Sequence, residues 1–332
     1  MRRVAYSQIF EQACQLAFGQ RTANTEDAAT LQVFLDNRLN EFWSDFFWPD
    51  VSAVEERWFR PWWVDGDTYL EGTEVYHAPS DAYYRCLDET SIEPATFVDG
   101  QWVVETTDWA VCQAEYSGEE WAEGMAYEDG DWLISPLDNK VYQVLVDHTS
   151  GSSWNAAVVG LLVSFVRSID WEQTGMTAID AVEKITPADP RIFSDQQSID
   201  FALFDNIVVW TDLKSVWVKF RSRPGTWSGS VFVANTTYAA GDQVYYSGDW
   251  YVALDSTTAT PDDATHWERI PVPYIFRDCA PMAAYADWLT AEGQHEKAAA
   301  MQKMAMSSLE REKTKILLDQ SQSKHKPVRS YR

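Results

Sequence analysis

The sequence predicts an α+β fold in which helical segments at both ends pack together and bracket β-rich insertions with three copies of a small aromatic β-module. Three observations predict it: helical periodicity near both ends, short alternating segments with turn residues between them, and a recurring tyrosine–glycine pattern. The chain has 332 residues, 45% of them hydrophobic and 23% charged, which is typical of a globular protein with a sizeable core. Tryptophan occurs 17 times, so many large aromatic side chains must be packed or must face a partner.

Changes in hydrophobic periodicity and composition divide the chain into seven segments. They are a helical hairpin (residues 1–57), a first module (58–118), a divergent second module (119–173), a central helix with strands (174–235), a third module (236–273), C-terminal helices (274–320) and an extended basic tail (321–332).

Two helices are predicted near the start of the chain. Apolar residues recur at helical spacing from Tyr6 onward, and Gly19 ends that run. A second helix is capped by Asn24 or Thr25, and Pro49 stops it. We expect the pair to pack as a helical hairpin.

The repeated pattern is Tyr-x-x-Gly-x-x-Val/Leu-Tyr/Ile, a turn, then Tyr-x-x-Leu and Asp-x-Thr. Its three copies begin at Tyr69, Tyr127 and Tyr238. The glycine supplies a turn, paired strands bring aromatics into cross-strand contact, and a late tryptophan closes a core too small to stand on its strands alone. That tryptophan is Trp109 in the first copy and Trp267 in the third; in the second it is Trp154 or Trp171.

Between the second and third copies, the pattern predicts a short helix over residues 177–185 and strands over residues 206–210 and 216–220. After the third copy the helical texture returns. Pro281 starts a helix, Gly293 breaks it, and a longer helix follows whose apolar stripe thins toward its end.

The formal charge is −25, which disfavours direct binding to DNA or to an anionic membrane. The charge is uneven, because residues 311–332 carry seven Lys/Arg against two acidic residues. A basic tail on an acidic chain indicates a specific acidic partner. The longest apolar run, residues 156–166, is too short to cross a bilayer, so we expect a soluble chain without membrane contact.

The four cysteines are widely spaced, which favours a reducing compartment without a disulfide framework. Cys86 and Cys112 could in principle meet within one module. The five histidines lack metal-ligand spacing, and no nucleophile elbow, phosphate loop or dinucleotide fingerprint occurs. We therefore expect no metal, no cofactor and no enzymatic activity. The densest carboxylate run, residues 119–131, is interpreted as a solvated acidic loop, with a weak cation site as the alternative.

Three aromatic residues of the third copy, Trp250, Tyr251 and Trp267, are candidates for contact with carbohydrate or protein. Positions shared by all copies, such as Tyr251, favour a role in the core of the module. Trp250 is not shared, and it is therefore the better candidate for a surface contact.

The third copy, YAAGDQVYYSGDWYVALDSTTATPDDATHW, resembles the chitin- and cellulose-binding modules of families 5 and 12. This resemblance implies, as one hypothesis, a carbohydrate-binding protein that uses its modules on host or environmental polysaccharide. The wider layout, with VWVKFRSRPGTWSG before this copy and YADWLTAEGQHEKAAAMQKMAMSSLEREKTKILLDQSQ after it, resembles the head–tail connector (adaptor, or neck) proteins of tailed bacteriophages.

The connector resemblance implies a structural virion protein, present in the host cytoplasm during assembly, whose helices form a homo-oligomeric ring of twelve subunits. The ring would lie between portal and tail, DNA would only pass through its channel, and the modules would decorate it or contact tail or neck proteins. An extended C-terminal tail would dock onto the portal protein. The residues implied to contact the portal are Lys313, Lys315, Lys324, Lys326, Arg329, Tyr331 and Arg332.

Overall fold

The computed structural model is of mixed α+β class, as the sequence predicts. It describes residues 2–20, 25–113, 117–173, 175–193 and 196–323. The chain divides into two compact units. The first unit is formed by Met1–Ala53 with Phe220–Arg332, and the second by Val54–Lys219.

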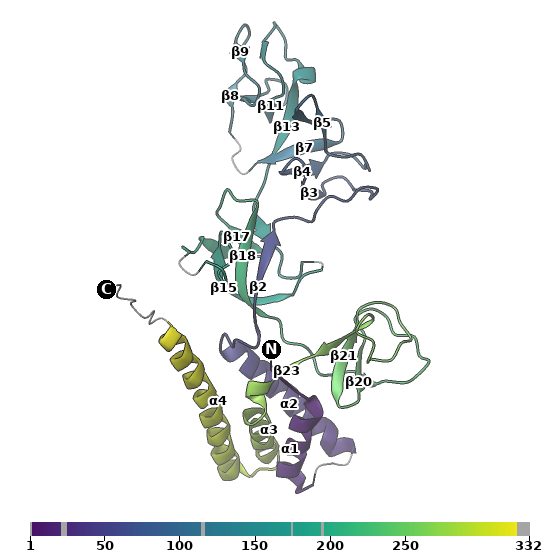
Figure 1. The fold of residues 1–332 in the computed structure, drawn as a ribbon, viewed down its shortest axis with the longest axis vertical. Helices are drawn as coiled ribbons and strands as arrows, with labels where there is room; N and C mark the ends of the chain where they lie inside the picture. Colours follow the sequence, from purple (N-terminus) through teal and green to yellow (C-terminus); the bar gives the residue numbers. More distant parts are fainter. Residues whose placement is uncertain (1, 21–24, 114–116, 174, 194–195, 324–332) are drawn as a thin grey trace, which may run out of the picture. The chain divides into compact units, whose positions relative to one another are not determined.

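The first unit contains the α-helices found among the described residues (Figure 1). They are α1 (Tyr6–Phe18), α2 (Thr25–Asp45), α3 (Cys279–Ala291) and α4 (His295–Ser323). The predicted helices are confirmed, although α3 begins at Cys279, so that Pro281 lies inside its first turn. Gly19 ends α1 with a φ of 70°, and Gly293 separates α3 from α4 with a φ of 73°.

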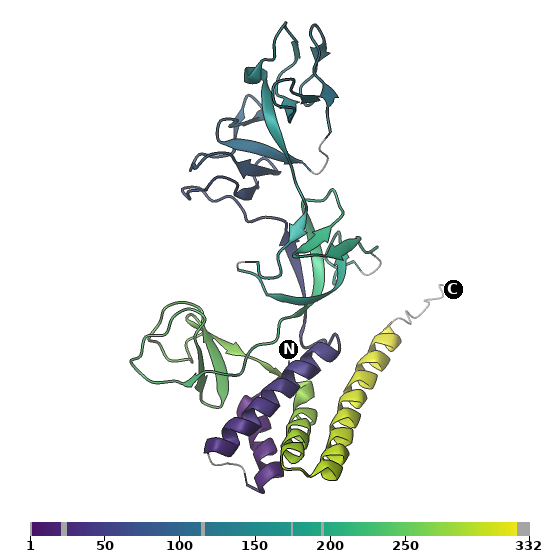
Figure 2. The same cartoon turned by 180° about the vertical axis from the view of Figure 1, so that it is seen from behind.

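Helix α3 is the centre of this bundle, because it contacts each of the other three helices. Both views of the ribbon show it between α4 on one side and α1 with α2 on the other (Figures 1 and 2). Its buried residues are mostly small, among them Ala280, Ala283 and Ala284, which lets the neighbouring helices approach closely. In α2, by contrast, leucines fill the core at four-residue spacing.

The same unit contains two small sheets. In the first, β1 (Arg3–Val4) pairs with β23 (Val272–Pro273). The second has the order β19 (Ser230–Val231), β20 (Gln243–Tyr246), β21 (Asp249–Ala253) and β22 (Trp267–Ile270). A 3-10 turn, η2 (Tyr274–Phe276), leads into α3.

The second unit is β-rich. Its largest sheet has the order β3 (Glu74–His77), β4 (Ala82–Cys86), β7 (Trp109–Gln113), β13 (Val159–Ser164), β11 (Val141–Val144), β10 (Trp132–Ile134) and β8 (Glu119–Glu120). Smaller sheets pair β5 (Ala95–Val98) with β6 (Gln101–Val104), and β9 (Ala126–Tyr127) with β12 (His148–Thr149). The short turn η1 (Ala156–Val158) precedes β13.

Two three-stranded sheets complete the second unit. The first has the order β14 (Ser168–Ile169), β17 (Ile207–Val209) and β16 (Phe201–Leu203). The second has the order β15 (Ile179–Thr186), β18 (Ser215–Ser222) and β2 (Ser52–Trp58). Strands β2 and β18 carry the chain between the two units. The strands predicted over residues 206–210 and 216–220 are confirmed as β17 and β18.

The helix predicted over residues 177–185 is wrong, because this stretch forms strand β15 beside β18. Apolar residues at helical spacing produced the error. The stretch also alternates in strand fashion and contains β-branched residues, and Ile179 and Ile185 are both buried. In so short a segment, tertiary pairing with β18 outweighs the helical pattern.

Three stretches of the chain share one set of backbone contacts, and we name them segment one (residues 61–113), segment two (119–164) and segment three (230–270). In each, a tyrosine hydroxyl accepts a hydrogen bond of 2.7–2.8 Å from the N–H five residues earlier. In each, a glycine with φ between 84° and 96° donates its N–H across the hairpin. The tyrosines are Tyr69, Tyr127 and Tyr238, and the glycines are Gly72, Gly130 and Gly241.

Each segment begins with a short element that the repeated pattern did not predict. An aromatic residue six positions before the tyrosine donates its N–H to the strand that follows the glycine. These residues are Trp63, Trp121 and Phe232, and their acceptors are the carbonyls of Tyr76, Ile134 and Tyr245. The constant six-residue spacing is visible in the sequence and would have revealed the element.

The closing position of segment two is Val159, and the prediction of Trp154 or Trp171 there is wrong. In strand register, Val159 lies opposite Val144, just as Trp109 lies opposite Cys86 and Trp267 opposite Ala253. Trp154 instead packs on Tyr142, with ring centroids 5.3 Å apart. The Trp171 indole donates to the Asp205 carbonyl, outside the segment.

Candidate functional site

The first predicted site is the end of α4, where the structure describes two of the seven residues implied to contact a portal. Lys313 and Lys315 lie on the helix. The other five, Lys324, Lys326, Arg329, Tyr331 and Arg332, lie outside the described residues. The geometry of the site therefore comes from the last described turns of α4 and from what packs beside them.

Lys313 is held within its own chain by two ion pairs. Its side chain is 17% exposed, and its Nζ lies 2.5 Å from Asp45 Oδ2 of α2 and 2.9 Å from Glu310 Oε1. Burial alone would lower the pKa of the Lys313 ammonium, but the hydrogen bonds to Asp45 and Glu310 raise it above its ordinary value. Lys313 therefore fastens the end of α4 to α2.

Lys315 is more available, since its side chain is 65% exposed and its one described ion pair is with Glu312 on the same helix. It lines a hollow of about 410 Å³ with residues of both charge signs. The other lining residues are Arg2, Pro49, Asp50, Tyr274, Ile275, Arg277, Asp278, Glu312 and Ile316. The Arg277 guanidinium stacks over the Tyr274 ring at 4.1 Å.

Next to Lys315, the helix carries exposed apolar side chains among the described residues. Leu317 and Leu318 are 53% and 55% exposed, whereas Ile316 packs against the helical core. The end of α4 is therefore two-sided: its inward face is used by the chain itself, and its outward face carries two leucines. The thinning apolar stripe near the end of the chain did not predict this exposed pair.

The second predicted site was the aromatic group of segment three, and here Trp250 is a correction. Trp250 is only 5% exposed, so the interpretation of it as a surface contact is wrong. Its ring meets the edge of Tyr6 in α1, with centroids 6.2 Å apart. Trp267 is 2% exposed, which confirms its core role, and Tyr251 is partly buried against the same cluster. Of the three residues, only Tyr251 keeps part of its ring accessible.

The burial of Trp250 follows from the way segment three holds the start of α1. The Tyr6 N–H donates to Asp249 Oδ1 at 3.1 Å, and the Ser7 N–H donates to the Gly248 carbonyl at 2.9 Å. The turn between β20 and β21 thus satisfies two first-turn N–H groups of the helix, and Asp249 brings a negative charge to its positive end. Segment three is part of the helical unit rather than a separate appendage.

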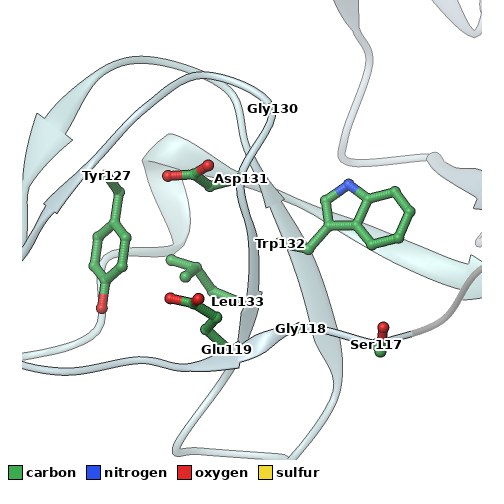
Figure 3. Close-up of a pocket in the computed structure, with 8 residues that line it drawn as sticks. All are labelled: Ser117, Gly118, Glu119, Tyr127, Gly130, Asp131, Trp132 and Leu133. Carbon is green, nitrogen blue, oxygen red and sulfur yellow. The ribbon is translucent and has the colours of Figure 1, made fainter.

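Segments two and three each contain a polar hollow at the same place. In segment two it measures about 530 Å³, and Tyr127, Asp131, Leu133 and Glu119 lie on one side of β10, while the Trp132 indole points to the other (Figure 3). The hollow of segment three, about 610 Å³, is lined by residues that include Tyr238, Asp242 and Gln243. Among the described residues, no histidine, cysteine, lysine or arginine lines the first hollow.

Within the described ranges, no group of three or more histidine, cysteine or acidic side chains is arranged to hold a metal ion. The four cysteines are buried free thiols, so Cys86 and Cys112 do not form a disulfide. Over the same residues, no helix combines the length and the apolar character that a membrane crossing requires.

The chain matches no protein-family model, and no curated protein matches its sequence significantly. Its function must therefore be inferred from the geometry of its own residues.

Proposed function

We propose that this protein is a structural virion component of a tailed bacteriophage, a head–tail adaptor that forms a ring between portal and tail and docks through its C-terminal tail. The observation that carries the proposal is the end of α4, where Leu317 and Leu318 are exposed beside Lys315. An apolar pair at the end of a helix that is otherwise anchored to its own core is typical of a surface covered by another subunit.

The helical unit supports this role mechanically. Helix α3 packs against its three neighbours through small residues, and Lys313 fastens α4 to α2. A rigid base of this kind presents the end of α4 in a fixed orientation, which lowers the entropic cost of association. The basic residues that follow α4 in the sequence would order on an acidic partner, which suits staged assembly.

The three repeat segments would be copies of one β-module inserted into this helical frame. Segments one and two share a sheet through parallel pairing of β7 with β13, and segment three is joined to the helices through Trp250. They would decorate the ring or contact tail or neck proteins. Their acidic character would also keep DNA from adhering while it passes through the channel.

Removal of residues 321–332 should abolish docking onto rings of the portal protein from the same phage and leave the thermal unfolding midpoint unchanged. The measurement is co-sedimentation with purified portal rings, followed by negative-stain imaging. The expected loss arises because the deletion removes four of the seven basic residues near the end of the chain and none of the described core.

A second variant tests the apolar part of the site. Leu317→Ser with Leu318→Ser should reduce ring formation or docking at least tenfold, whereas Met304→Ser, at an exposed position earlier on α4, should have little effect. Normal docking of the truncated protein would contradict the tail mechanism. Normal assembly of the double leucine variant would contradict the proposed subunit contact.

A further inference from the structure

Segment one differs from the other two by an insertion. From the threonine of the Asp-x-Thr motif to the closing position, segment two spans ten residues (Thr149 to Val159) and segment three also spans ten (Thr257 to Trp267). In segment one the same interval, Thr90 to Trp109, spans 19 residues. Because segments two and three close without the extra nine residues, the insertion is not needed to complete the fold.

The inserted residues form the hairpin β5–β6. Ala95 pairs with Val104 at its base and Phe97 pairs with Trp102 further out. Asp99 and Gly100 turn the chain with φ of 50° and 90°, the two positive values that a tight type I′ hairpin turn requires. Only the base enters the core, where Ala95 is fully buried.

The outer part of the hairpin exposes large apolar side chains on both faces. Phe97 and Trp102 lie on one face, with 61% and 38% exposure, and Val98 and Val103 lie on the other, with 48% and 49%. The two rings alone leave on the order of 200 Å² in water, since aromatic side chains offer about 150–250 Å² each. An isolated two-stranded hairpin is marginal in water, so such a surface indicates a partner.

Beyond its base, the hairpin contacts the body of segment one through Trp102. The Trp102 ring meets the edge of the His77 imidazole, with centroids 5.7 Å apart. His77 is itself fixed, because its ring nitrogens lie 2.7 Å from Ser80 Oγ and 3.0 Å from Glu93 Oε1. The apolar surface is thus held in place before any partner arrives, which favours binding.

The charges around the hairpin select among partners. Residues 86–139 contain 14 acidic residues and no lysine or arginine. This field repels nucleic acid and anionic lipid. A second copy of the same unit is disfavoured as well, since it would bring the same excess of negative charge. The rings of Phe97 and Trp102 are inclined at 58°, so they do not form the flat platform that stacks on a sugar ring.

We propose that hairpin β5–β6 is a docking surface for a protein partner whose contact segment carries apolar side chains beside lysine or arginine. The apolar side chains would cover Phe97 and Trp102, and the basic side chains would meet the acidic surroundings. Docking at this hairpin requires neither ring formation nor the C-terminal tail.

The test is selection of a random 12-residue peptide display library on the full-length protein. The retained peptides should combine at least two apolar residues with a net positive charge, and synthetic copies should bind less tightly as salt rises from 50 to 500 mM. Phe97→Ser should weaken their binding at least tenfold, and this variant leaves the contact between Trp102 and His77 in place. Leu137→Ser, at a 78% exposed leucine in the second segment, is the matched control and should bind like the wild type.

Neutral or acidic retained peptides, or equal binding to Phe97→Ser and wild type, would overturn the proposal. Two further measurements exclude other occupants. Co-sedimentation with vesicles of phosphatidylcholine, or with 30% phosphatidylserine added, should show no binding that depends on Phe97. Sedimentation velocity should show no self-association that depends on Phe97. Vesicle binding that depends on Phe97 would replace the proposed partner by a membrane, and self-association that depends on Phe97 would replace it by a second copy.

Discussion

The two units of this chain differ in charge as sharply as they differ in fold. The unit Val54–Lys219 contains 31 of the 51 acidic and 9 of the 26 basic residues, which gives it a formal charge of −22. The unit of Met1–Ala53 with Phe220–Arg332 has the remaining 20 acidic and 17 basic residues, and its charge is −3. The acidity of the chain is therefore a property of its inserted β-rich unit.

Their cores differ in the same way. The helical unit has a cluster of 24 buried hydrophobic residues, which takes in Trp250 and Ile270 of segment three, beside a cluster of four within segment three. Two of the clusters in the acidic unit, one mainly in segment one and one in segment two, contain eight and four. A small core contributes little to the free energy of unfolding. Segments one and two therefore depend on the sheet that they share through β7 and β13.

The difference shows that segment three plays a different structural part from its two counterparts. It caps α1 and lends a tryptophan to the helical core, whereas segments one and two pair with each other. Pro271 follows β22 at the position that Gln113 occupies in β7, and proline cannot donate to a further strand. The edge of segment three is therefore unsuited to the pairing that joins the other two.

The largest expected effect tests whether segment three belongs to the helical core. Trp250→Ala should cost about 3–5 kcal/mol of unfolding free energy, because it leaves a cavity between β21 and α1. Hydrogen–deuterium exchange should accelerate in α1 and α3 and stay unchanged in β3 and β4. Trp210→Ala, at a 57% exposed tryptophan of the acidic unit, should cost less than about 1 kcal/mol. Equal acceleration in both units would show that their cores are not separate.

The next effect concerns the turn that precedes β19 in segment three. Gly229 has a φ of 152°, and a Cβ built on it would lie 2.2 Å from the Gln243 carbonyl oxygen. Gly229→Ala should therefore cost about 2–4 kcal/mol in urea unfolding, since β19 must move away from β20. Gly241→Ala, where a Cβ meets open space, should cost about 1 kcal/mol. The equivalent position immediately before segment one is Arg60, which forms a 2.6 Å ion pair with Glu74.

The outcome separates segment three from segment one in a second way. A glycine is required at position 229 because backbone approaches closely there, whereas segment one accommodates a long side chain at the same place. Equal losses of unfolding free energy for Gly229→Ala and Gly241→Ala would mean that β19 can move away from β20 without destabilising the fold. The close backbone approach at position 229 would then not distinguish the two segments.

The smallest effect concerns a carboxyl group in the helical unit. Burial raises the pKa of Asp36 to about 7, although its hydrogen bond from the Tyr6 hydroxyl opposes the shift. Between pH 4 and 7 the folded chain keeps a proton that the unfolded chain has lost, so this group's contribution to stability is lost as pH rises through that window. The side chain introduced by Asp36→Asn stays neutral. The difference in unfolding free energy between variant and wild type should therefore shift by roughly 1–3 kcal/mol in favour of the variant when pH rises from 4 to 8.

The measurement is urea unfolding of both proteins across this pH range. The amide oxygen introduced by Asp36→Asn can still accept from the Tyr6 hydroxyl, so the substitution changes charge more than shape. Parallel stability curves for wild type and variant would show that Asp36 does not titrate in the window.

Periodicity predicted the helices well, because helical pattern and stop residues act within a few positions along the chain. Gly19 and Gly293 stand where helices end, and the repeated glycines adopt the positive φ values that their turns require. The same reasoning failed over residues 177–185, where a nine-residue stretch fits both periods and β18 decided the outcome. It also failed at Val159, because segments two and three share the ten-residue spacing to the closing position but not the tryptophan at that position.

The candidate site was less predictable than the fold. Trp250 is covered by Tyr6, and Lys313 is paired with Asp45, in each case a residue near the opposite end of the chain. Conversely, the sequence of hairpin β5–β6 contains Phe97 and Trp102 on either side of an Asp-Gly turn. Only the structure shows that these side chains are exposed.

The helical ends, the repeated tyrosine–glycine pattern and the basic end of an acidic chain could all be read from the sequence alone, because each depends on residues close together in the chain. Tertiary structure decided which aromatic residues are core and which are surface, and which lysines are already paired. Burial and ion pairing are set by whatever lies nearby in space, and in this protein the neighbours that matter are brought together from opposite ends of the chain.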